Sequence, residues 1–323
     1  MAVCENLNID DFKTWVICPG DIFYQTKAGK NIHLHAPGDL INHSFFSKYL
    51  PYKDQLYIEM LVDRSLIAEG KAYLEDWIKK ENILEQRRAA LEFLNWVHSK
   101  YWKNAEKACL LDLSMVFFES FFKSHSLQEL LKDTNIEYFK RSLAASAIGS
   151  VLSICLGYFN PTVVMDFYNI VYLLDVKIHE SFSSFKIWES FESDRINGPL
   201  NYDLSEKEKK IIADHVGEID FNNDHFDNIK NLQLLNLLNK HHETINGKGF
   251  PFALTENELS DLECVLIFSN NLISIVNHSF NENDGREFFK NILNYNDRDL
   301  GRTLGRRISK ISVNVFKNFD EVA

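Results

Sequence analysis

The chain has 323 residues, of which 45% are hydrophobic and 13% aromatic, so it can bury at least one substantial core. Its 25 phenylalanines exclude an intrinsically disordered chain. The formal charge of -11, without any long basic run, argues against DNA or RNA as a partner. A small anionic ligand stays compatible with this charge, because a local pocket can be basic on an acidic protein.

The cysteines and the first residues indicate the compartment. Five cysteines are scattered without a C-x-x-C pair, which excludes zinc-finger and redox motifs. The odd cysteine count and a polar, acidic beginning unlike a signal peptide favour a reducing cytoplasm. Because no stretch reaches the roughly 18 uninterrupted apolar residues of a membrane helix, we expect no membrane span.

Residues 1–60 predict a small domain that contains strands. Four β-branched and aromatic segments alternate with turn-forming residues at 19–21, 27–30 and 37–39. The predicted strands cover 14–18, 22–24, 31–35 and 55–58. His33 and His35 would share one face of a strand and could ligate a metal. A solvated strand face is the favoured interpretation, because no cysteine or carboxylate joins them.

The rest of the chain predicts helices, so the fold class is mainly α. Residues 61–132 have apolar residues at helical spacing and are interpreted as a helical connector. Residues 133–323 predict a bundle of medium-length helices. The helical segments are expected at 72–78, 87–101, 110–122, 137–156, 161–174, 205–219, 226–242, 256–276, 285–294 and 299–316.

One segment, His241–Pro251, carries chemistry: HHETINGKGFP. Adjacent residues on a regular helix point about 100° apart, so a His-His pair rarely ligates one ion from within a helix. At a helix end that leads into a glycine-rich loop, however, both imidazoles can turn inward. His215 and Asp175 could then complete a site for iron, manganese or zinc. The alternative is a pair of surface histidines beside a glycine turn.

The segment resembles the signature of the HD-GYP family, His-His-Glu followed by Asp-Gly-x-Gly-Tyr-Pro. Both histidines, the glutamate, both glycines and the proline keep their spacing, whereas Asn246 replaces the aspartate and Phe250 the tyrosine. The similarity runs from about residue 137 to 295. It implies an all-helical HD-type domain of the kind that hydrolyses cyclic di-GMP at two metal ions. The small strand-containing region and helical linker also resemble the arrangement that precedes this domain in some members.

The resemblance also implies which metal ligands are present. Every ligand of one of the two metals is matched, by Asp175, His215, His241 and His242. The ligands private to the other metal are absent. Leu174 stands in place of the histidine of the His-Asp pair, Asn270 in place of the last aspartate, and no histidine lies near Arg141 and Ser142. We therefore expect one divalent metal, iron or manganese before others, and no second ion.

A single metal implies impaired catalysis. Phosphodiester hydrolysis in the family uses a hydroxide bridging two cations, and losing one cation removes the nucleophile and several kcal/mol of charge stabilisation. We predict a receptor or scaffold that still binds cyclic di-GMP or signalling proteins. One alternative is a working phosphodiesterase that recruits Asp175, Lys177 or Glu243; the other is a purely structural interaction module. The residues expected to face a nucleotide are Gly247, Lys248, Gly249, Phe250 and Pro251, where Phe250 keeps a ring for stacking but lacks the tyrosine hydroxyl.

Overall fold

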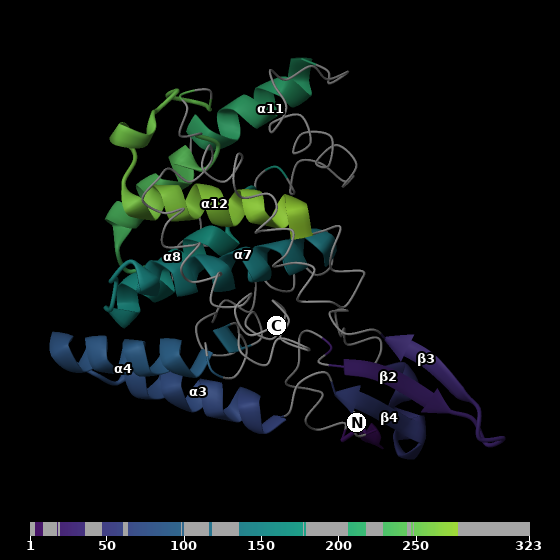
Figure 1. The fold of residues 1–323 in the computed structure, drawn as a ribbon. Coiled ribbons are helices and arrows are strands. Elements are labelled where there is room, and N and C mark those ends of the chain that lie inside the picture. The colour runs from purple at the N-terminus through teal and green to yellow at the C-terminus, as the bar shows by residue number, and fades with distance from the viewer. Residues whose placement is uncertain are drawn as a thin grey trace, which may run out of the picture.

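The computed structural model confirms a mainly helical chain with a small N-terminal antiparallel sheet (Figure 1). It describes residues 4–8, 18, 20–35, 47–60, 64–97, 99, 116–117, 136–176, 178, 206–217, 229–243, 247 and 249–276. The predicted helices 285–294 and 299–316, and nearly all of 110–122, lie outside these residues. So does the predicted boundary between residues 132 and 133.

The sheet has the strand order β1-β4-β2-β3, and all its pairs are antiparallel. Its strands are β1 (Cys4–Asn6), β2 (Gly20–Gln25), β3 (Asn31–His35) and β4 (Leu56–Met60). β4 follows the 3-10 helix η1 (Leu50–Gln55). The prediction omitted β1, because its three residues CEN are polar and carry no β-branched signal.

The turn predicted at residues 19–21 is wrong, because β2 already begins at Gly20 and includes Asp21. The reason is a close approach of two strands. A Cβ at Gly20 would lie 2.2 Å from the carbonyl oxygen of Glu59 on β4, so only glycine can pair there. The sheet buries its own small cluster on one face, made of Leu7, Cys18, Ile22, Leu56 and Ile58.

Two amphipathic helices, α3 (Arg64–Ile78) and α4 (Ile83–Val97), form a hairpin after the sheet. At Gly70 of α3 a Cβ would lie 2.4 Å from the ring of Trp96, so the absence of a side chain allows this close packing. The indole N–H of Trp77 donates to the carbonyl oxygen of Phe159, 2.9 Å away. This hydrogen bond attaches the hairpin to the connection just before the helix that begins at Pro161.

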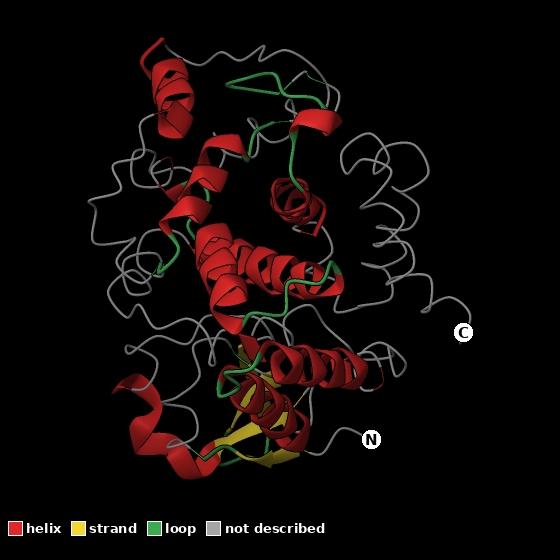
Figure 2. Ribbon diagram, turned by 90° about the vertical axis from the view of Figure 1, so that its left-hand side faces the viewer, coloured by secondary structure: helices red, strands yellow, loops and turns green. Residues whose placement is uncertain are grey.

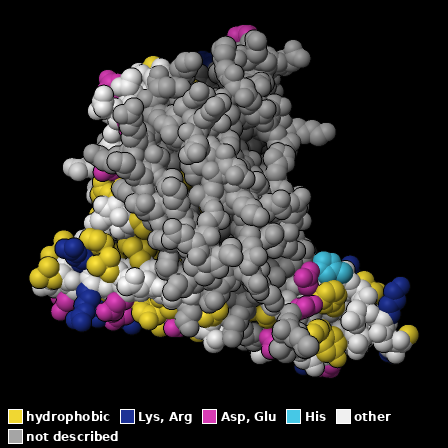
Figure 3. Space-filling view, in the orientation of Figure 1, with side chains coloured by type: hydrophobic (Ala, Val, Ile, Leu, Met, Phe, Trp, Pro, Cys, Tyr) yellow, Lys and Arg dark blue, Asp and Glu magenta, His cyan; other side chains and the backbone are white. Residues whose placement is uncertain are grey.

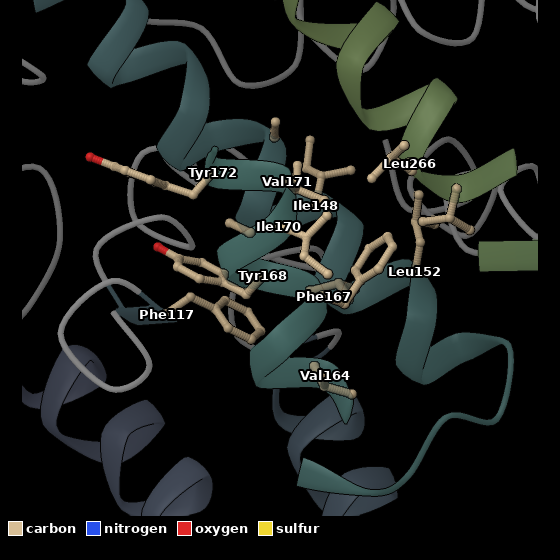
Figure 4. Packing of buried hydrophobic residues seen from close by; sticks show 14 of the residues in the cluster. Phe117, Ile148, Leu152, Val164, Phe167, Tyr168, Ile170, Val171, Tyr172 and Leu266 are labelled. Carbon is tan, nitrogen blue, oxygen red and sulfur yellow. The ribbon is translucent and has the colours of Figure 1, made fainter. Parts of the chain in front are cut away.

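The centre of the bundle is built from α7 (Ile136–Cys155), α8 (Pro161–Tyr172) and α12 (Asp261–Val276). Figure 4 shows apolar side chains of α8, among them Phe167, Ile170 and Val171, packed with Ile148 and Leu152 of α7 and with Leu266. The hydroxyls of three buried serines on α7, Ser146, Ser150 and Ser153, donate back to helix carbonyls three or four residues earlier. This local pairing lets serines lie in a buried interface.

The helices are stacked in order away from the sheet end of the molecule. Figures 1 and 2 show the α3–α4 hairpin, then α7 and α8, then α12, with α11 (Glu206–Gly217) at the far end. One hydrophobic cluster runs through the α3–α4 hairpin, α7, α8 and α12, from Ile67 to Phe268. The α3–α4 hairpin thus shares its core with the helices that follow, whereas the sheet has a separate cluster.

Two predicted helices differ from the structure. The segment predicted as one helix from 226 to 242 contains a shorter 3-10 helix, η4 (Leu232–Lys240), which begins where the side chain of Asn231 accepts from the backbone N–H of Gln233. The segment 256–276 divides into η5 (Glu256–Glu258) and α12, because Thr255 with Glu258 and Ser260 with Glu263 each make a local pair of capping bonds.

No helix in the described part of the chain combines the length and the apolar character that crossing a bilayer requires.

Candidate metal centre

Asp175 lies three residues after the end of α8, in the turn 173–175 that follows this helix. Its backbone has φ 63°, a left-handed conformation that residues other than glycine adopt at a cost in free energy. The hydroxyl of Tyr138 on α7 donates to the carbonyl oxygen of the preceding residue, Leu174, and so ties this turn to α7. Because of this turn, the Asp175 carboxylate does not lie on the continuation of α8.

The two adjacent histidines lie at the end of η4. His241 is the C-terminal cap of that helix, with φ -70° and ψ -15°, and His242 follows in a turn. The rings of the two residues tilt by 43° with their centroids 4.0 Å apart. Both Nε2 atoms reach the same oxygen, Oδ1 of Asp175. The inward turn of both imidazoles that the sequence suggested is thus present.

A third histidine, His215 of α11, joins the pair. Its Nε2 lies 3.2 Å from Asp175 Oδ1, 2.9 Å from His242 Nε2 and 3.4 Å from His241 Nε2. The carboxylate oxygen is 2.9 Å from His241 Nε2 and 3.2 Å from His242 Nε2. Four donor atoms from three separate stretches of chain therefore converge within 4.8 Å of one another.

The hydrogen bonding of His241 shows that the cluster needs a positive charge at its centre. Its Nδ1 lies 2.5 Å from the carbonyl oxygen of Leu238, and a carbonyl only accepts, so Nδ1 carries the hydrogen. In the neutral ring Nε2 then presents a lone pair to Asp175 Oδ1, 2.9 Å away. Two acceptors at this distance repel unless a proton or a metal ion lies between them. A backbone carbonyl on the other ring nitrogen is also what orients a metal-ligating histidine.

The distances fit a metal. Ligands about 2.1 Å from an ion lie about 3.0 Å apart at right angles and about 3.4 Å apart at tetrahedral angles. Five of the six separations between the donors lie between 2.9 and 3.4 Å, and all four donor atoms lie within 4.8 Å of one another. One carboxylate with three imidazoles is a donor set that suits divalent iron, manganese or zinc. The group of Asp175, His215, His241 and His242 could therefore hold one such ion.

Burial and charge favour a neutral ring at His242 and an ionised carboxylate at Asp175, the states in which these two groups can ligate a metal. The four side chains are at most 3% exposed. Burial, reinforced by the charge of His241, holds the pKa of His242 well below its usual value, so this ring is neutral and can donate a lone pair. Burial alone would raise the pKa of Asp175. The charge of His241 and the hydrogen bonds of the three histidines outweigh it, so the pKa is held well below its usual value.

The positions expected to lack ligands for a second metal are apolar or neutral in the structure. Leu174 is buried in the hydrophobic core of the bundle, 3% exposed, and supplies no donor. Asn270 is buried on α12 and offers a neutral amide in place of a carboxylate. Ser142 is likewise buried, on α7, and its carbonyl accepts from Ser146.

Glu243 is occupied by the backbone of the following loop. Its two carboxylate oxygens accept from the backbone N–H groups of Phe252, at 2.6 Å, and Leu254, at 2.8 Å. The side chain is buried. Because each oxygen already accepts a backbone N–H, this carboxylate fixes the shape of the loop that contains residues 249–254 (the signature loop). That arrangement favours a structural role for Glu243 over the catalytic role considered from the sequence.

The ring of Phe250 is also engaged. It stacks on the imidazole of His242, with centroids 4.7 Å apart and planes 11° from parallel. The backbone N–H of Phe250 donates to the carbonyl oxygen of His242 at 3.2 Å. The peptide bond to Pro251 is cis. Gly247 has φ 70°, which explains the glycine there. A base stacking on Phe250 would therefore have to use the face that His242 leaves open.

Two of the predicted site residues, Lys177 and Lys248, lie outside the described residues. His33 and His35 are far less enclosed than the four ligands. His33 Nε2 contacts Asp21 Oδ1 at 2.7 Å in a pair whose side chains are 48% and 31% exposed. Figure 3 shows histidine beside acidic side chains on the surface of this end of the molecule. Within the described part of the chain, no potential metal group of three donors includes either histidine.

Sequence reasoning missed Asp166, which is fully buried on α8 and accepts from the backbone N–H groups of Lys230 and Asn231. A signal existed: Asp166 is the sole charged residue in the helix PTVVMDFYNIVY. It also missed Glu263, which pairs with Lys240 just before the histidines. Burial raises the pKa of Glu263, but its hydrogen bonds with Lys240 and Ser260 outweigh this effect and lower it.

Comparison with known proteins gave one structural likeness. The chain is similar to the solved structure of Bd1817, described as an HDG"Y"P protein from Bdellovibrio bacteriovorus, with 15% sequence identity and a TM-score of 0.41. The match covers 98% of this chain and 99% of that chain. The chain matches no protein-family model and no curated protein.

Proposed function

We propose that the chain is a degenerate HD-GYP protein of cyclic di-GMP signalling that acts as a receptor or scaffold and holds at most one divalent metal. The convergence of Asp175, His215, His241 and His242 supports this proposal most directly. The signature spacing of His241–Pro251 supports the family, and the donor set supports iron or manganese.

The enclosure of the donors argues against efficient hydrolysis. Structural metal sites are closed by four protein ligands, whereas catalytic sites keep an open position for water or substrate. Here four protein donors are available and their side chains are at most 3% exposed. A bound ion would neutralise the Asp175 carboxylate and join α11 to η4 and to the end of α8. The role that follows is to hold the signature loop in a fixed shape for binding.

The residues around the ion would have distinct roles. Asp175 and the three histidines would hold it, and the Leu238 carbonyl orients His241. Glu243 fixes the loop through the amides of Phe252 and Leu254. Gly247, Gly249, Phe250 and Pro251, with Lys248, are the proposed contacts for a nucleotide. Bound metal would supply Lewis-acid character to this site.

The decisive experiment combines metal analysis, nucleotide binding and turnover. Iron- or manganese-loaded protein is titrated calorimetrically with cyclic di-GMP, and parallel incubations are separated by chromatography. Saturable binding with an unchanged nucleotide and at most one metal per chain is the expected result. Linear dinucleotide or GMP that disappears in the His241→Ala variant would overturn the receptor proposal in favour of a one-metal phosphodiesterase.

Two further outcomes would contradict the proposal. Two tightly held ions per chain would show that ligands outside the matched set complete a binuclear centre. Absence of affinity for both metal and nucleotide would leave a purely structural interaction module, in which the histidines have lost their earlier role.

A further inference from the structure

Asp166 is a buried carboxylate on the same helix that leads to Asp175. Its side chain is 0% exposed and lies among the core residues of α8, nine positions before the ligand. It donates nothing and reaches no metal donor in any described contact. Instead, Oδ1 accepts from the N–H of Lys230 at 3.1 Å and Oδ2 accepts from the N–H of Asn231 at 2.7 Å.

These two amides immediately precede η4, the helix that ends at the histidine pair. Asn231 is its N-cap, and its side-chain oxygen accepts from Gln233 N–H at 3.1 Å. Asp166 thus holds the beginning of η4, and Asn231 then starts the helix. A buried carboxylate that accepts two backbone amides makes strong, charge-assisted hydrogen bonds, and it also complements the positive end of the helix.

The other end of η4 is held by a different helix. Lys240 pairs with Glu263 of α12, whose second carboxylate oxygen accepts from Ser260 N–H at 2.6 Å. The histidine-bearing segment is therefore fixed to α12 at its end and to α8 at its beginning. Of these two polar contacts, the one at its beginning involves α8, the helix that also leads to Asp175.

We propose that Asp166 is a positioning residue for the metal centre, through which α8 sets the separation between Asp175 and the pair His241 and His242. This assignment rests on the proposed metal site. One rigid helix holds the carboxylate ligand at its end and, through Asp166, the segment that carries two of the three imidazoles. A shift of η4 along α8 would separate Nε2 of His241 from Oδ1 of Asp175, which now lie 2.9 Å apart.

The variant that tests this role is Asp166→Asn, which keeps the side-chain shape but replaces one acceptor oxygen with an amide that cannot accept. Residues that hold metal ligands in place typically change metal affinity by about 10–100-fold when they are mutated. We expect the dissociation constant for cobalt(II), measured by competition with a chelator, to rise by at least about tenfold. We also expect the visible spectrum of the bound cobalt, which depends on coordination geometry, to change.

The matched control is Val164→Ala, on the same helix and equally buried. It removes core contacts without touching η4 amides, so it should lower the melting temperature of the metal-free protein and leave the cobalt affinity and spectrum as in the wild type. This comparison separates positioning from a general loss of stability.

Each other outcome overturns the assignment. Unchanged cobalt affinity and spectrum in Asp166→Asn, with the wild type binding cobalt normally, would remove the role of Asp166 but leave the metal centre standing. An equal loss of affinity in Val164→Ala would show that stability alone controls binding. Wild-type protein that binds no cobalt would remove the metal centre and this role together.

Discussion

Two regions in the described part of the chain carry histidines, and only one of them makes a candidate site. On β3, His33 and His35 alternate along one partly exposed strand, and His33 contacts Asp21 and the ring of Phe23. In the bundle, His215, His241 and His242 come from α11 and the end of η4, and all three meet one oxygen of Asp175 in the interior. The number of nearby histidines is similar, yet the chemistry differs.

The difference is convergence under burial. A local pattern such as alternation on a strand leaves His33 and His35 partly exposed, so water can reach the polar atoms of their rings. In the bundle, four donors from separate segments face one another without solvent, so leaving them without a cation between them is unfavourable. Metal sites are therefore recognised by what tertiary structure brings together, not by how many histidines lie close in the sequence.

The largest expected contrast is in metal binding. His241→Ala should weaken the binding of iron(II) or manganese(II) by more than about 100-fold, because losing a ligand should exceed the ~10–100-fold effect of the residues that only orient ligands. His33→Ala should leave binding unchanged. Metal content after dialysis against a weak chelator, measured by inductively coupled plasma mass spectrometry, decides between them. Equal metal retention in both variants would show that His241 contributes no more to metal binding than His33 does.

A smaller effect is expected from the carboxylate that holds the signature loop. Glu243→Ala leaves the amides of Phe252 and Leu254 without their acceptor, so the free energy of unfolding should fall by about 2 kcal/mol. Glu258→Ala removes an exposed capping carboxylate whose amide partner water can satisfy, so its effect should be smaller. Urea denaturation of the metal-free variants measures both. Unchanged stability of Glu243→Ala would mean that the loop is held by other contacts.

The stability of the metal-free protein should depend on pH through the buried cluster. The folded-state pKa of His242 lies well below 6.5, the ordinary value at which this ring protonates in the unfolded chain. Below that pH the unfolded chain binds the additional proton, so stability falls as the pH falls, by at most about 1.4 kcal/mol per pH unit for one proton. The lowered pKa of Asp175 adds a loss of the same sign at more acidic pH, below about 3.9.

Denaturation with excess chelator at pH 7, 6 and 5 measures this slope. His242→Gln should flatten it, whereas His33→Gln should not. A slope that is the same in the wild type and in His242→Gln would show that other groups account for it.

The smallest effect is expected at the sheet. Asp21→Asn removes the charge partner of His33 in a pair whose side chains are 31% and 48% exposed, so stability should change by no more than about 1 kcal/mol. Metal content should stay at the wild-type value. Thermal unfolding in low and high salt tests this expectation, and a larger, salt-dependent loss would show that the pair matters more than an exposed ion pair usually does.

The sequence by itself determined the class of fold and indicated where the candidate metal site lies. Apolar residues at helical spacing placed α7, α8 and α12 to within a few residues, apart from the break before α12, and the alternation of Asn31–His35 placed β3 with its observed bounds. The spacing of His241–Pro251 indicated a histidine pair at the end of a helix. These features depend on neighbours in the chain, and periodicity reports such neighbours directly.

Only the tertiary structure decided how the pair faces Asp175 and which side chains hold it there. The short η4, the left-handed turn at Asp175 and the anchoring of η4 by Asp166 each depend on contacts between residues distant in sequence. Asp166 and Lys230 are 64 positions apart, and no local pattern encodes their meeting. Burial makes buried polar groups depend on such long-range contacts, because it removes the water that would otherwise satisfy each polar group separately.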